Sequence, residues 1–235
     1  MSNVQTIHFM SDGDRLAGTL HLPDTHRPPV VIGCHGLLAD RHSPKQIALA
    51  EALGRIQIAY FRFDHRGCGD SQGRIEASDL LSSRCRELYH AMRTMQTFSA
   101  VGDIIGLFGS SFGGTVVMAT AVEHPVARMV TYAAPINSRT IERAAARKVH
   151  HRQLTSLAPL EQFSFDIGAR LDHLHNILII HGELDEIVPP SHARHIFECA
   201  ADPKQLIIQP GGDHRMSAPH DQQDFLQASV AWFRG

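Results

Sequence analysis

The chain has 235 residues, and its 22 lysine and arginine residues nearly balance its 24 aspartate and glutamate residues. A domain of this length buries roughly 70–75% of the surface of its unfolded chain, enough for a hydrophobic core without disulfides or a structural metal. The near-neutral charge argues against a nucleic-acid partner, and four scattered cysteines with no C-x-x-C pair argue against a disulfide framework or a zinc site.

The sequence shows no sign of a signal peptide, a membrane-spanning segment or a metal site. Residues 1–6 lack a basic region followed by an apolar run, and no apolar stretch approaches the ~20 residues needed to cross a bilayer. We therefore expect a cytoplasmic protein with no membrane partner. The 17 histidines form no ligand spacing such as H-E-x-x-H, so we also expect no metal site.

The chain begins with a predicted antiparallel hairpin. Residues 4–10 and 16–22 alternate apolar and polar side chains around a turn-forming Ser-Asp-Gly-Asp cluster. Buried strands and helices then alternate along the chain. The predicted strands are 30–34, 56–63, 103–108, 127–134, 177–180 and 205–209; the predicted helices are 44–54, 77–98, one that ends before Pro125, 191–200 and 221–233.

This alternation predicts an α/β fold in which helical crossovers join parallel strands, with helices on both faces of the sheet. No internal repeat or linker is evident, so we expect a single domain over residues 1–235. The composition changes at about 136–175. Basic residues outnumber the single acidic residue between 139 and 152, and the spacing of apolar residues there is helical. We interpret this segment as a short cap inserted over the sheet.

Residues 103–114 contain the most informative functional pattern. A strand-like half is followed by Gly109-Ser110-Ser111-Phe112-Gly113, which matches G-x-S-x-G. That pattern is typical of a sharp strand-to-helix turn that projects a serine from the carboxyl edge of a sheet. Glycines suit the turn because a strained serine backbone brings the strand and the helix close together. The motif predicts Ser111 as a nucleophile; a glycine-rich turn that only happens to contain serine is the alternative.

An acid and a base follow later strands. Asp185 comes after the strand at 177–180, and His214 after the strand at 205–209. Reactive side chains of an open parallel sheet gather outside the carboxyl ends of its strands. The chain order serine, aspartate, histidine is the one expected when a G-x-S-x-G turn carries a triad. We therefore predict Ser111, Asp185 and His214 as the catalytic residues.

The chain resembles a known superfamily over essentially its whole length. The segments that carry the resemblance are His35-Gly36, the loop at 64–71, the elbow at 109–114, the segment at 181–189, and Gly211-Gly212-Asp213-His214. They resemble α/β-hydrolases, and most closely small serine esterases with a short cap, the cinnamoyl/feruloyl-esterase and serine-aminopeptidase-like group. The resemblance implies a mostly parallel eight-stranded sheet, hydrolysis through an acyl-enzyme and no cofactor. It does not select a substrate.

Serine chemistry assigns a role to each predicted residue. A serine hydroxyl is a poor nucleophile at neutral pH, so Ser111 needs a base such as His214 within hydrogen-bond reach. Asp185 is expected to fix the imidazole tautomer. Attack turns a carbonyl into an oxyanion, which needs preorganised donors. We predict the backbone N–H groups of Leu37 and Phe112 as those donors.

Neighbouring polar residues offer competing assignments. Ser110 is adjacent to Ser111, but the glycine spacing selects Ser111. Glu183 and Glu186 flank Asp185 and are interpreted as surface or helix-entry acids. Other polar neighbours are expected to have structural roles: Asp213 in shaping its loop, His35 in ordering the oxyanion loop, and Arg66, Gly67, Gly69 and Ser71 in a tight loop beneath it.

The predicted cap contains the least specific signals. Leu160 and Phe163 are candidates for lining an acyl or aryl pocket, with ordinary packing as the alternative. The cap's basic residues are expected to be solvated, and contact with a carboxylate-bearing substrate is the alternative.

Together these features predict a serine hydrolase, in the first place a carboxylesterase that cleaves small or aromatic acyl esters. A thioesterase or a peptidase with the same triad is the nearest enzymatic alternative. A non-catalytic ligand-binding or receptor protein on the same fold is the alternative of a different class. The expected partner is a small-molecule ester, and the oligomeric state is left open.

Overall fold

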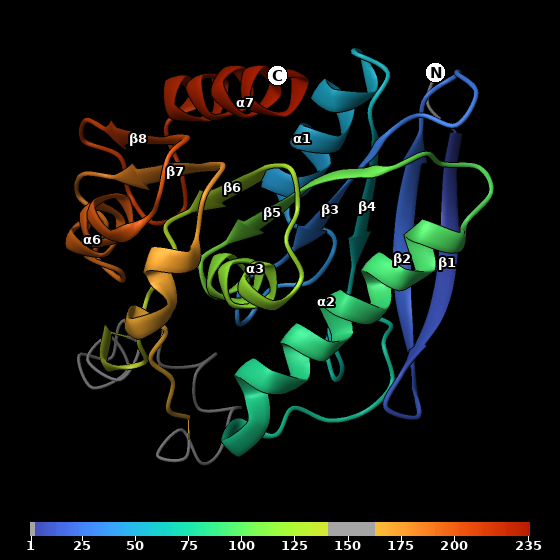
Figure 1. Ribbon diagram of the computed structural model, residues 1–235, viewed down its shortest axis with the longest axis horizontal. Helices are drawn as coiled ribbons and strands as arrows, with labels where there is room; N and C mark the ends of the chain where they lie inside the picture. Colours follow the sequence, from blue (N-terminus) through green and yellow to red (C-terminus); the bar gives the residue numbers. More distant parts are fainter. Residues whose placement is uncertain (1–2, 141–162) are drawn as a thin grey trace.

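The computed structural model describes residues 3–140 and 163–235. Within these residues, eight strands form one sheet in the spatial order β1-β2-β4-β3-β5-β6-β7-β8 (Figure 1). β1 pairs antiparallel with β2, β2 pairs antiparallel with β4, and the other neighbours are parallel. This confirms the predicted sheet and its N-terminal hairpin. The strands are β1 (Asn3–Ser11), β2 (Asp14–Leu22), β3 (Val30–Cys34), β4 (Ala59–Phe63), β5 (Ile104–Ser110), β6 (Met129–Tyr132), β7 (Ile177–Gly182) and β8 (Lys204–Gln209).

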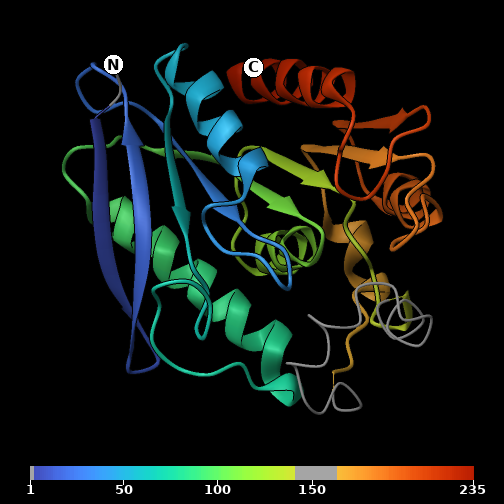
Figure 2. The ribbon, with the colours of Figure 1, turned by 180° about the vertical axis from the view of Figure 1, so that it is seen from behind.

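Helices cover both faces of the sheet, which the views from the front and from behind both show (Figures 1 and 2). α1 and α7 lie on one face, and α2, α3 and α6 lie on the other. The helices are α1 (Pro44–Gly54), α2 (Leu80–Thr97), α3 (Phe112–Glu123), α6 (Ser191–Cys199) and α7 (Pro219–Arg234), with the 3-10 turns η1 (Ala77–Asp79) at the start of α2 and η3 (Gly168–His173) before β7.

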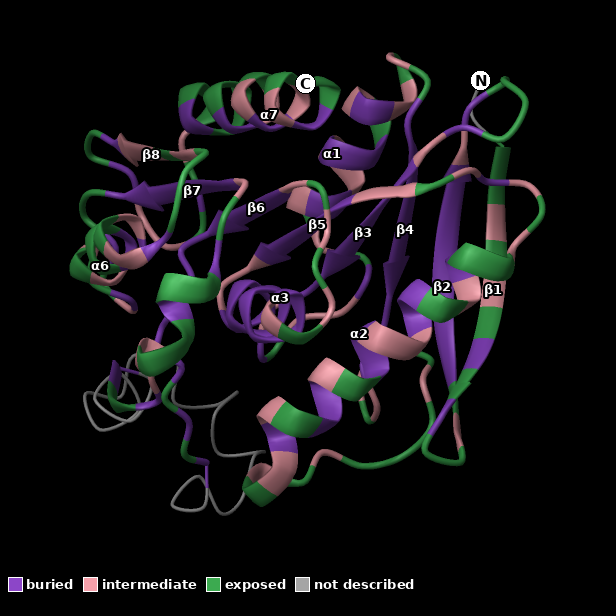
Figure 3. Ribbon diagram, in the orientation of Figure 1, coloured by how far each residue is buried: buried purple, intermediate pink, exposed green. Residues whose placement is uncertain are grey.

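The two helical layers follow from the alternation of side chains along each strand. In β3, Val31 packs in the core shared with α1 and α7, whereas Ile32 packs in the core shared with α2 and α3. Phe108 and Leu107 of β5 divide in the same way. β3, β6 and β7 are therefore buried along their length and β5 over its middle residues (Figure 3), as their apolar sequences predict.

Two strands are shorter than predicted, and the backbone gives the reason. The strand predicted at 56–63 begins at Ala59, because the preceding turn closes α1 with Gln57 in the left-handed region at a φ of 63°. The strand predicted at 127–134 is limited to β6, since Ala133 leaves the extended conformation with a φ of 52°. Apolar composition continues across both turns, so composition alone did not mark these boundaries.

The predicted cap at 136–175 is described only at its two ends. Asn137 forms an isolated antiparallel bridge with Asp166, and the Ser138 N–H donates to the Phe165 carbonyl at 2.9 Å. The two ends of the insertion are thus joined at its base. The helix predicted within the insertion lies outside the described residues. Among the helices of residues 3–140 and 163–235, none is long and apolar enough to span a membrane.

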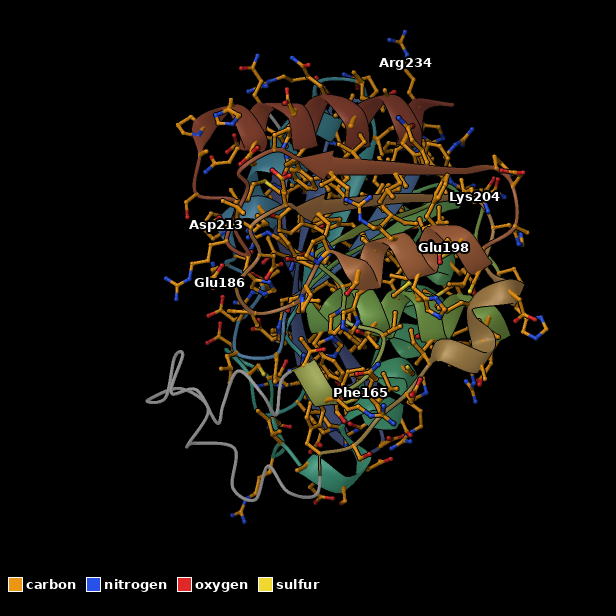
Figure 4. The ribbon with its side chains drawn as sticks, turned by 90° about the vertical axis from the view of Figure 1, so that its left-hand side faces the viewer. Phe165, Glu186, Glu198, Lys204, Asp213 and Arg234 are labelled. Carbon is orange, nitrogen blue, oxygen red and sulfur yellow. The ribbon has the colours of Figure 1, made fainter. Side chains whose placement is uncertain are left out.

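The parallel connections bring several loops to one edge of the sheet. All strands from β3 to β8 run in the same direction, so the segments that follow them meet at their carboxyl ends. Figure 4 shows Glu186, after β7, and Asp213, after β8, at one edge, whereas Lys204, where β8 begins, lies at the other. The predicted serine, acid and base all belong to this carboxyl edge.

Candidate active site

Ser111 occupies the turn between β5 and α3. Its φ of 54° and ψ of −127° lie outside the regions that residues with side chains normally adopt, at a cost on the order of 1–3 kcal/mol. The Ser111 N–H donates to the Tyr132 carbonyl of β6 at 2.7 Å, and the Gly114 N–H donates to the Ser111 carbonyl at 2.8 Å. The neighbouring strand and the first turn of α3 therefore hold the strained backbone in place.

Two glycines permit the close approach that this turn requires. A Cβ on Gly109 would overlap the carbonyl oxygen of Gly113. A Cβ on Gly113 would overlap the Cys34 carbonyl and lie 2.6 Å from that of His35. These are backbone atoms of α3, of the end of β3 and of the loop after it, so they cannot move without shifting those elements. The steric role that G-x-S-x-G predicts for its glycines is present.

Gly113→Ala is expected to lower the free energy of unfolding by about 1–3 kcal/mol, because the added methyl group overpacks against the end of β3. Urea unfolding measures the change. Gly54→Ala is the matched control, since the space around a Cβ at that position, the last residue of α1, is open. Equal stability of the two variants would contradict the steric account of the turn.

Ser111, His214 and Asp185 form one hydrogen-bonded row. His214 Nε2 lies 3.1 Å from Ser111 Oγ, and His214 Nδ1 lies 2.8 Å from Asp185 Oδ2. A carboxylate only accepts, so Nδ1 carries the proton and Nε2 is free to accept from the serine hydroxyl. The Asp185 side chain is fully buried and that of His214 is 13% exposed. The three residues predicted from chain order thus come together in space.

Hydrogen bonds besides the one from His214 also orient the Asp185 carboxylate. Its Oδ1 accepts the N–H groups of Ile187 at 2.9 Å and Val188 at 2.7 Å, and its Oδ2 also lies 3.2 Å from His181 Nε2. Burial by itself raises the pKa of Asp185, but the hydrogen bonds from His181 and His214 outweigh burial and hold the pKa well below its ordinary value. The carboxylate is therefore ionised at neutral pH, as an orienting acid must be.

The loop after β3 passes beside the serine. A Cβ on Gly36 would lie 3.5 Å from the Ser111 Cβ. Phe112 is the first residue of α3, so its N–H has no partner within the helix. Within the described residues, 3–140 and 163–235, neither the Leu37 N–H nor the Phe112 N–H donates to a backbone carbonyl. Among the described residues both predicted oxyanion donors thus lack a backbone acceptor, and the loop that carries Leu37 passes beside Ser111.

His35 ties this loop to the loop after β4. Its Nε2 accepts the His65 N–H at 3.1 Å, so Nδ1 carries the proton and donates to the Gly36 carbonyl at 2.8 Å. Burial lowers the pKa of His35 well below its usual value, and the nearby His65 and Arg84 lower it further. The ring is neutral and serves as a fixed bridge, which supports the structural role expected for His35.

The sequence did not reveal three buried charged residues beneath this loop. Arg41 forms an ion pair with Asp64, and Glu87 accepts from His65 Nδ1 at 2.6 Å. Arg84 is buried on the same face of α2 as Glu87. Charged residues at helix positions where periodicity predicts apolar side chains are the signal that could have identified Arg84 and Glu87. Arg41 lies in a loop and carries no comparable signal.

Of the two candidate substrate-binding residues, the structure describes only Phe163. Leu160 lies outside the described residues. Phe163 is buried, and its ring centroid lies 5.3 Å from that of Phe112. It is packed against the elbow, and its role in a pocket wall stays a prediction. A cavity of about 540 Å³ borders the oxyanion loop and is lined in part by Leu37 and Ile75.

The competing acids do not replace Asp185. Glu186 accepts the backbone N–H of His214 at 3.4 Å, so it contacts the main chain of the loop and not the imidazole. Glu183 accepts a backbone N–H of the same loop. Asp213 accepts from the Ser217 N–H at 2.8 Å and from its hydroxyl at 2.6 Å, which is the loop-shaping role expected for it.

Other reactive side chains of the described segments form no competing centre. No group of three or more His, Cys, Asp or Glu residues there could hold a metal ion. The four cysteines are free thiols, as their scattered positions predict. Cys34 is fully buried, and burial raises its pKa, so this thiol is unreactive.

Known proteins resemble the chain in sequence and in fold. Residues 25–176, more than half of the chain, match the Hydrolase_4 family, described as serine aminopeptidase, S33. The uncharacterized protein Rv2307c of Mycobacterium tuberculosis is 28% identical over 213 residues, covering 86% of this chain and 69% of the relative.

Two solved structures illustrate the likeness of fold. The esterase PF2001 of Pyrococcus furiosus superposes with a TM-score of 0.83 at 17% identity, over 99% of this chain and 91% of the esterase. Est1E of Butyrivibrio proteoclasticus with ferulic acid bound gives a TM-score of 0.75 at 19% identity, over 97% and 98% of the two chains. Together with the family match, they confirm the resemblance to α/β-hydrolases. The chain belongs to the Hydrolase_4 family of α/β-hydrolases.

Proposed function

We propose that the protein is a serine hydrolase that cleaves carboxylic esters with small or aromatic acyl groups. The observation that carries the proposal is the row from Ser111 Oγ through His214 to Asp185, with separations of 3.1 and 2.8 Å. A binding protein has no need of a nucleophile, a base and an orienting acid in this order. The backbone amides of Leu37 and Phe112, which lack a backbone acceptor among the described residues, support the proposal as donors to the oxyanion of acyl transfer.

The proposed reaction has two halves. Ser111 Oγ attacks the ester carbonyl while His214 Nε2 takes the hydroxyl proton, and the Leu37 and Phe112 amides bind the oxyanion. Collapse of the tetrahedral intermediate breaks the bond to the alcohol oxygen, which leaves with the proton from His214. Water, deprotonated by His214, then attacks the acyl-serine, and the carboxylic acid and the free serine result.

Two structurally similar proteins support the preference for esters. They are described as an esterase and as Est1E with ferulic acid, an aromatic acid, bound. Phe163 and Phe165, at the end of the insertion, pack against each other and against Phe112, the first residue of α3. All three rings are buried, so contact between them and an aromatic acyl group stays a prediction.

A peptidase is the second candidate, because the family is described as serine aminopeptidase. The same row can cleave an amide, with His214 protonating an amine in place of an alcohol. A thioesterase uses the same chemistry with a thiolate leaving group. The three activities differ in the leaving group, so a matched set of substrates separates them.

A fluorophosphonate probe is expected to label the folded protein on Ser111, because the row activates this hydroxyl. Mass spectrometry of the labelled peptide distinguishes Ser111 from Ser110, and Ser110→Ala is expected to keep the label. The same preparation is assayed with p-nitrophenyl butyrate, an acyl-CoA and an aminoacyl anilide, and the ester is expected to turn over fastest. A folded but unlabelled protein indicates a ligand-binding protein; fastest turnover of the anilide indicates a peptidase.

A further inference from the structure

Arg84 is the largest fully buried side chain of the described residues, with 1% of its surface exposed. Taking a guanidinium out of water costs several kcal/mol unless good partners replace the water. The nearest acid on the same helix, Glu87, pairs with His65 and Arg66 instead. Within residues 3–140 and 163–235, Arg84 has no ion pair with a carboxylate, so its partners must be of another kind.

Its partners lie on the candidate oxyanion loop, on α3 and on the loop after β4, where Nη2 donates to Cys68 Sγ at 3.7 Å. Nη1 donates to the Gly36 carbonyl at 3.3 Å, and Nη2 donates to the Leu37 carbonyl at 3.1 Å. The guanidinium also lies over the Phe112 ring, 5.3 Å from its centroid. Leu37 and Phe112 are the residues whose amides are the predicted oxyanion donors and lack a backbone acceptor among the described residues. A buried cation therefore contacts both residues that supply the predicted donors.

The planar geometry of the peptide unit means that these contacts also orient the Leu37 N–H. The Gly36 carbonyl and the Leu37 N–H belong to one planar trans peptide unit, so they point in opposite directions. Fixing the carbonyl on the Arg84 side therefore directs the N–H to the opposite side. Hydrogen bonds to the carbonyl oxygen also polarise the unit, which makes its N–H a stronger donor.

We propose that Arg84 is a positioning residue of the oxyanion hole, which fixes the Gly36–Leu37 peptide so that the Leu37 N–H is aimed at the reacting carbonyl. Its buried charge also favours the negative charge that develops there, because interactions between charges are strong in a water-excluded site. His35 donates to the same Gly36 carbonyl from a neutral ring. The Ala39 N–H also donates to this carbonyl, at 3.3 Å. Of these three donors to the Gly36 carbonyl, Arg84 is the charged one.

This inference rests on the proposed hydrolase function, so the test begins with active wild-type protein. Arg84→Met removes the two hydrogen bonds to the loop carbonyls, the contact with Cys68 and the charge. Arg84→Lys keeps the charge but lacks the planar fork that reaches two carbonyls. Arg86→Met is the matched control, since Arg86 is an exposed arginine of α2 that pairs with Asp12 and Asp79. Ester turnover is expressed per active site titrated with fluorophosphonate, so unfolded molecules do not count.

Arg84→Met is expected to lower kcat per titrated site about 10- to 100-fold with little change in KM, somewhat less than the 10²–10³ lost with an oxyanion donor itself. Arg84→Lys is expected to be intermediate, and Arg86→Met to match the wild type. The ratio of the inhibition constants of a trifluoromethyl ketone, which binds as an oxyanion adduct, and its methyl ketone analogue should change in parallel with kcat.

A purely structural Arg84 would give a different result. Its variants would lose thermal stability and titrated sites, while kcat per site and the inhibitor ratio stay at the wild-type values; that outcome overturns the inference and leaves the hydrolase function intact. A wild-type protein that neither hydrolyses the ester nor reacts with fluorophosphonate overturns the hydrolase function, and the role of Arg84 with it. Parallel losses in kcat and in the inhibitor ratio support the proposal.

Discussion

Ser111→Ala is expected to lower kcat for p-nitrophenyl butyrate by about a million-fold, to the background rate of the assay. The expected loss is this large because Ser111 Oγ is the atom that His214 Nε2 contacts at 3.1 Å, and no other hydroxyl takes part in the row. The change is small in volume and sits at a surface that must already accommodate substrate. The variant should therefore fold as the wild type does, which circular dichroism and thermal unfolding can establish.

Ser110→Ala provides the control for this experiment. Ser110 is the last residue of β5 and pairs with Tyr132 in the sheet, so it belongs to the strand and not to the turn. Its replacement is expected to leave kcat within a few-fold of the wild type. A folded Ser111→Ala protein that retains ester turnover, or a Ser110→Ala protein that loses it, would show that the nucleophile has been assigned wrongly.

Asp185→Asn is expected to lower kcat about 10⁴-fold while the fold is retained. The reason is the tautomer of His214, whose Nδ1 proton is held by Asp185 Oδ2 at 2.8 Å so that Nε2 remains available as a base. An asparagine amide can present its N–H₂ to Nδ1 and place the proton on Nε2 instead. Glu183→Gln is the matched control, because this exposed neighbouring acid contacts only a loop amide. Comparable losses in both variants would contradict the role of Asp185.

Acid unfolding offers an independent measurement on the same carboxylate. Because the pKa of Asp185 is lowered in the folded state, its contribution to stability is complete above the ordinary aspartate pKa of about 4 and is lost as the pH falls through the folded value. The difference in unfolding free energy between wild type and Asp185→Asn is therefore expected to narrow between about pH 5 and about pH 3. A difference that stays constant or widens over this interval contradicts the hydrogen-bonded, ionised carboxylate.

Much of the fold could be predicted because its signals are local. Strands β3 and β7 are runs of apolar residues buried on both faces, and such runs demand a helical layer on each side. The ends of β4 and β6 were missed because backbone turns at Gln57 and Ala133 interrupt apolar segments without a change in composition. The spatial order of the strands, in which β4 precedes β3, follows from long-range pairing that no local pattern records.

The sequence by itself determined the identities of the candidate nucleophile, base and acid. The glycines of the elbow allow only one serine at the strained position, and chain order places Asp185 and His214 after later strands of the same sheet. Parallel strands carry whatever follows them to a common edge, so order along the chain becomes proximity in space. This is why Ser111, His214 and Asp185 could be grouped without knowledge of any distance.

Only the tertiary structure decided how that site is supported. His35, His65 and Arg84 come from the loop after β3, the loop after β4 and the buried face of α2, and they meet beneath one peptide unit. Each of them taken alone is a polar residue in an apolar or loop segment, and its partners are separated from it by tens of residues. Contacts of this kind depend on how helices and loops pack across the sheet, which periodicity along one segment does not encode.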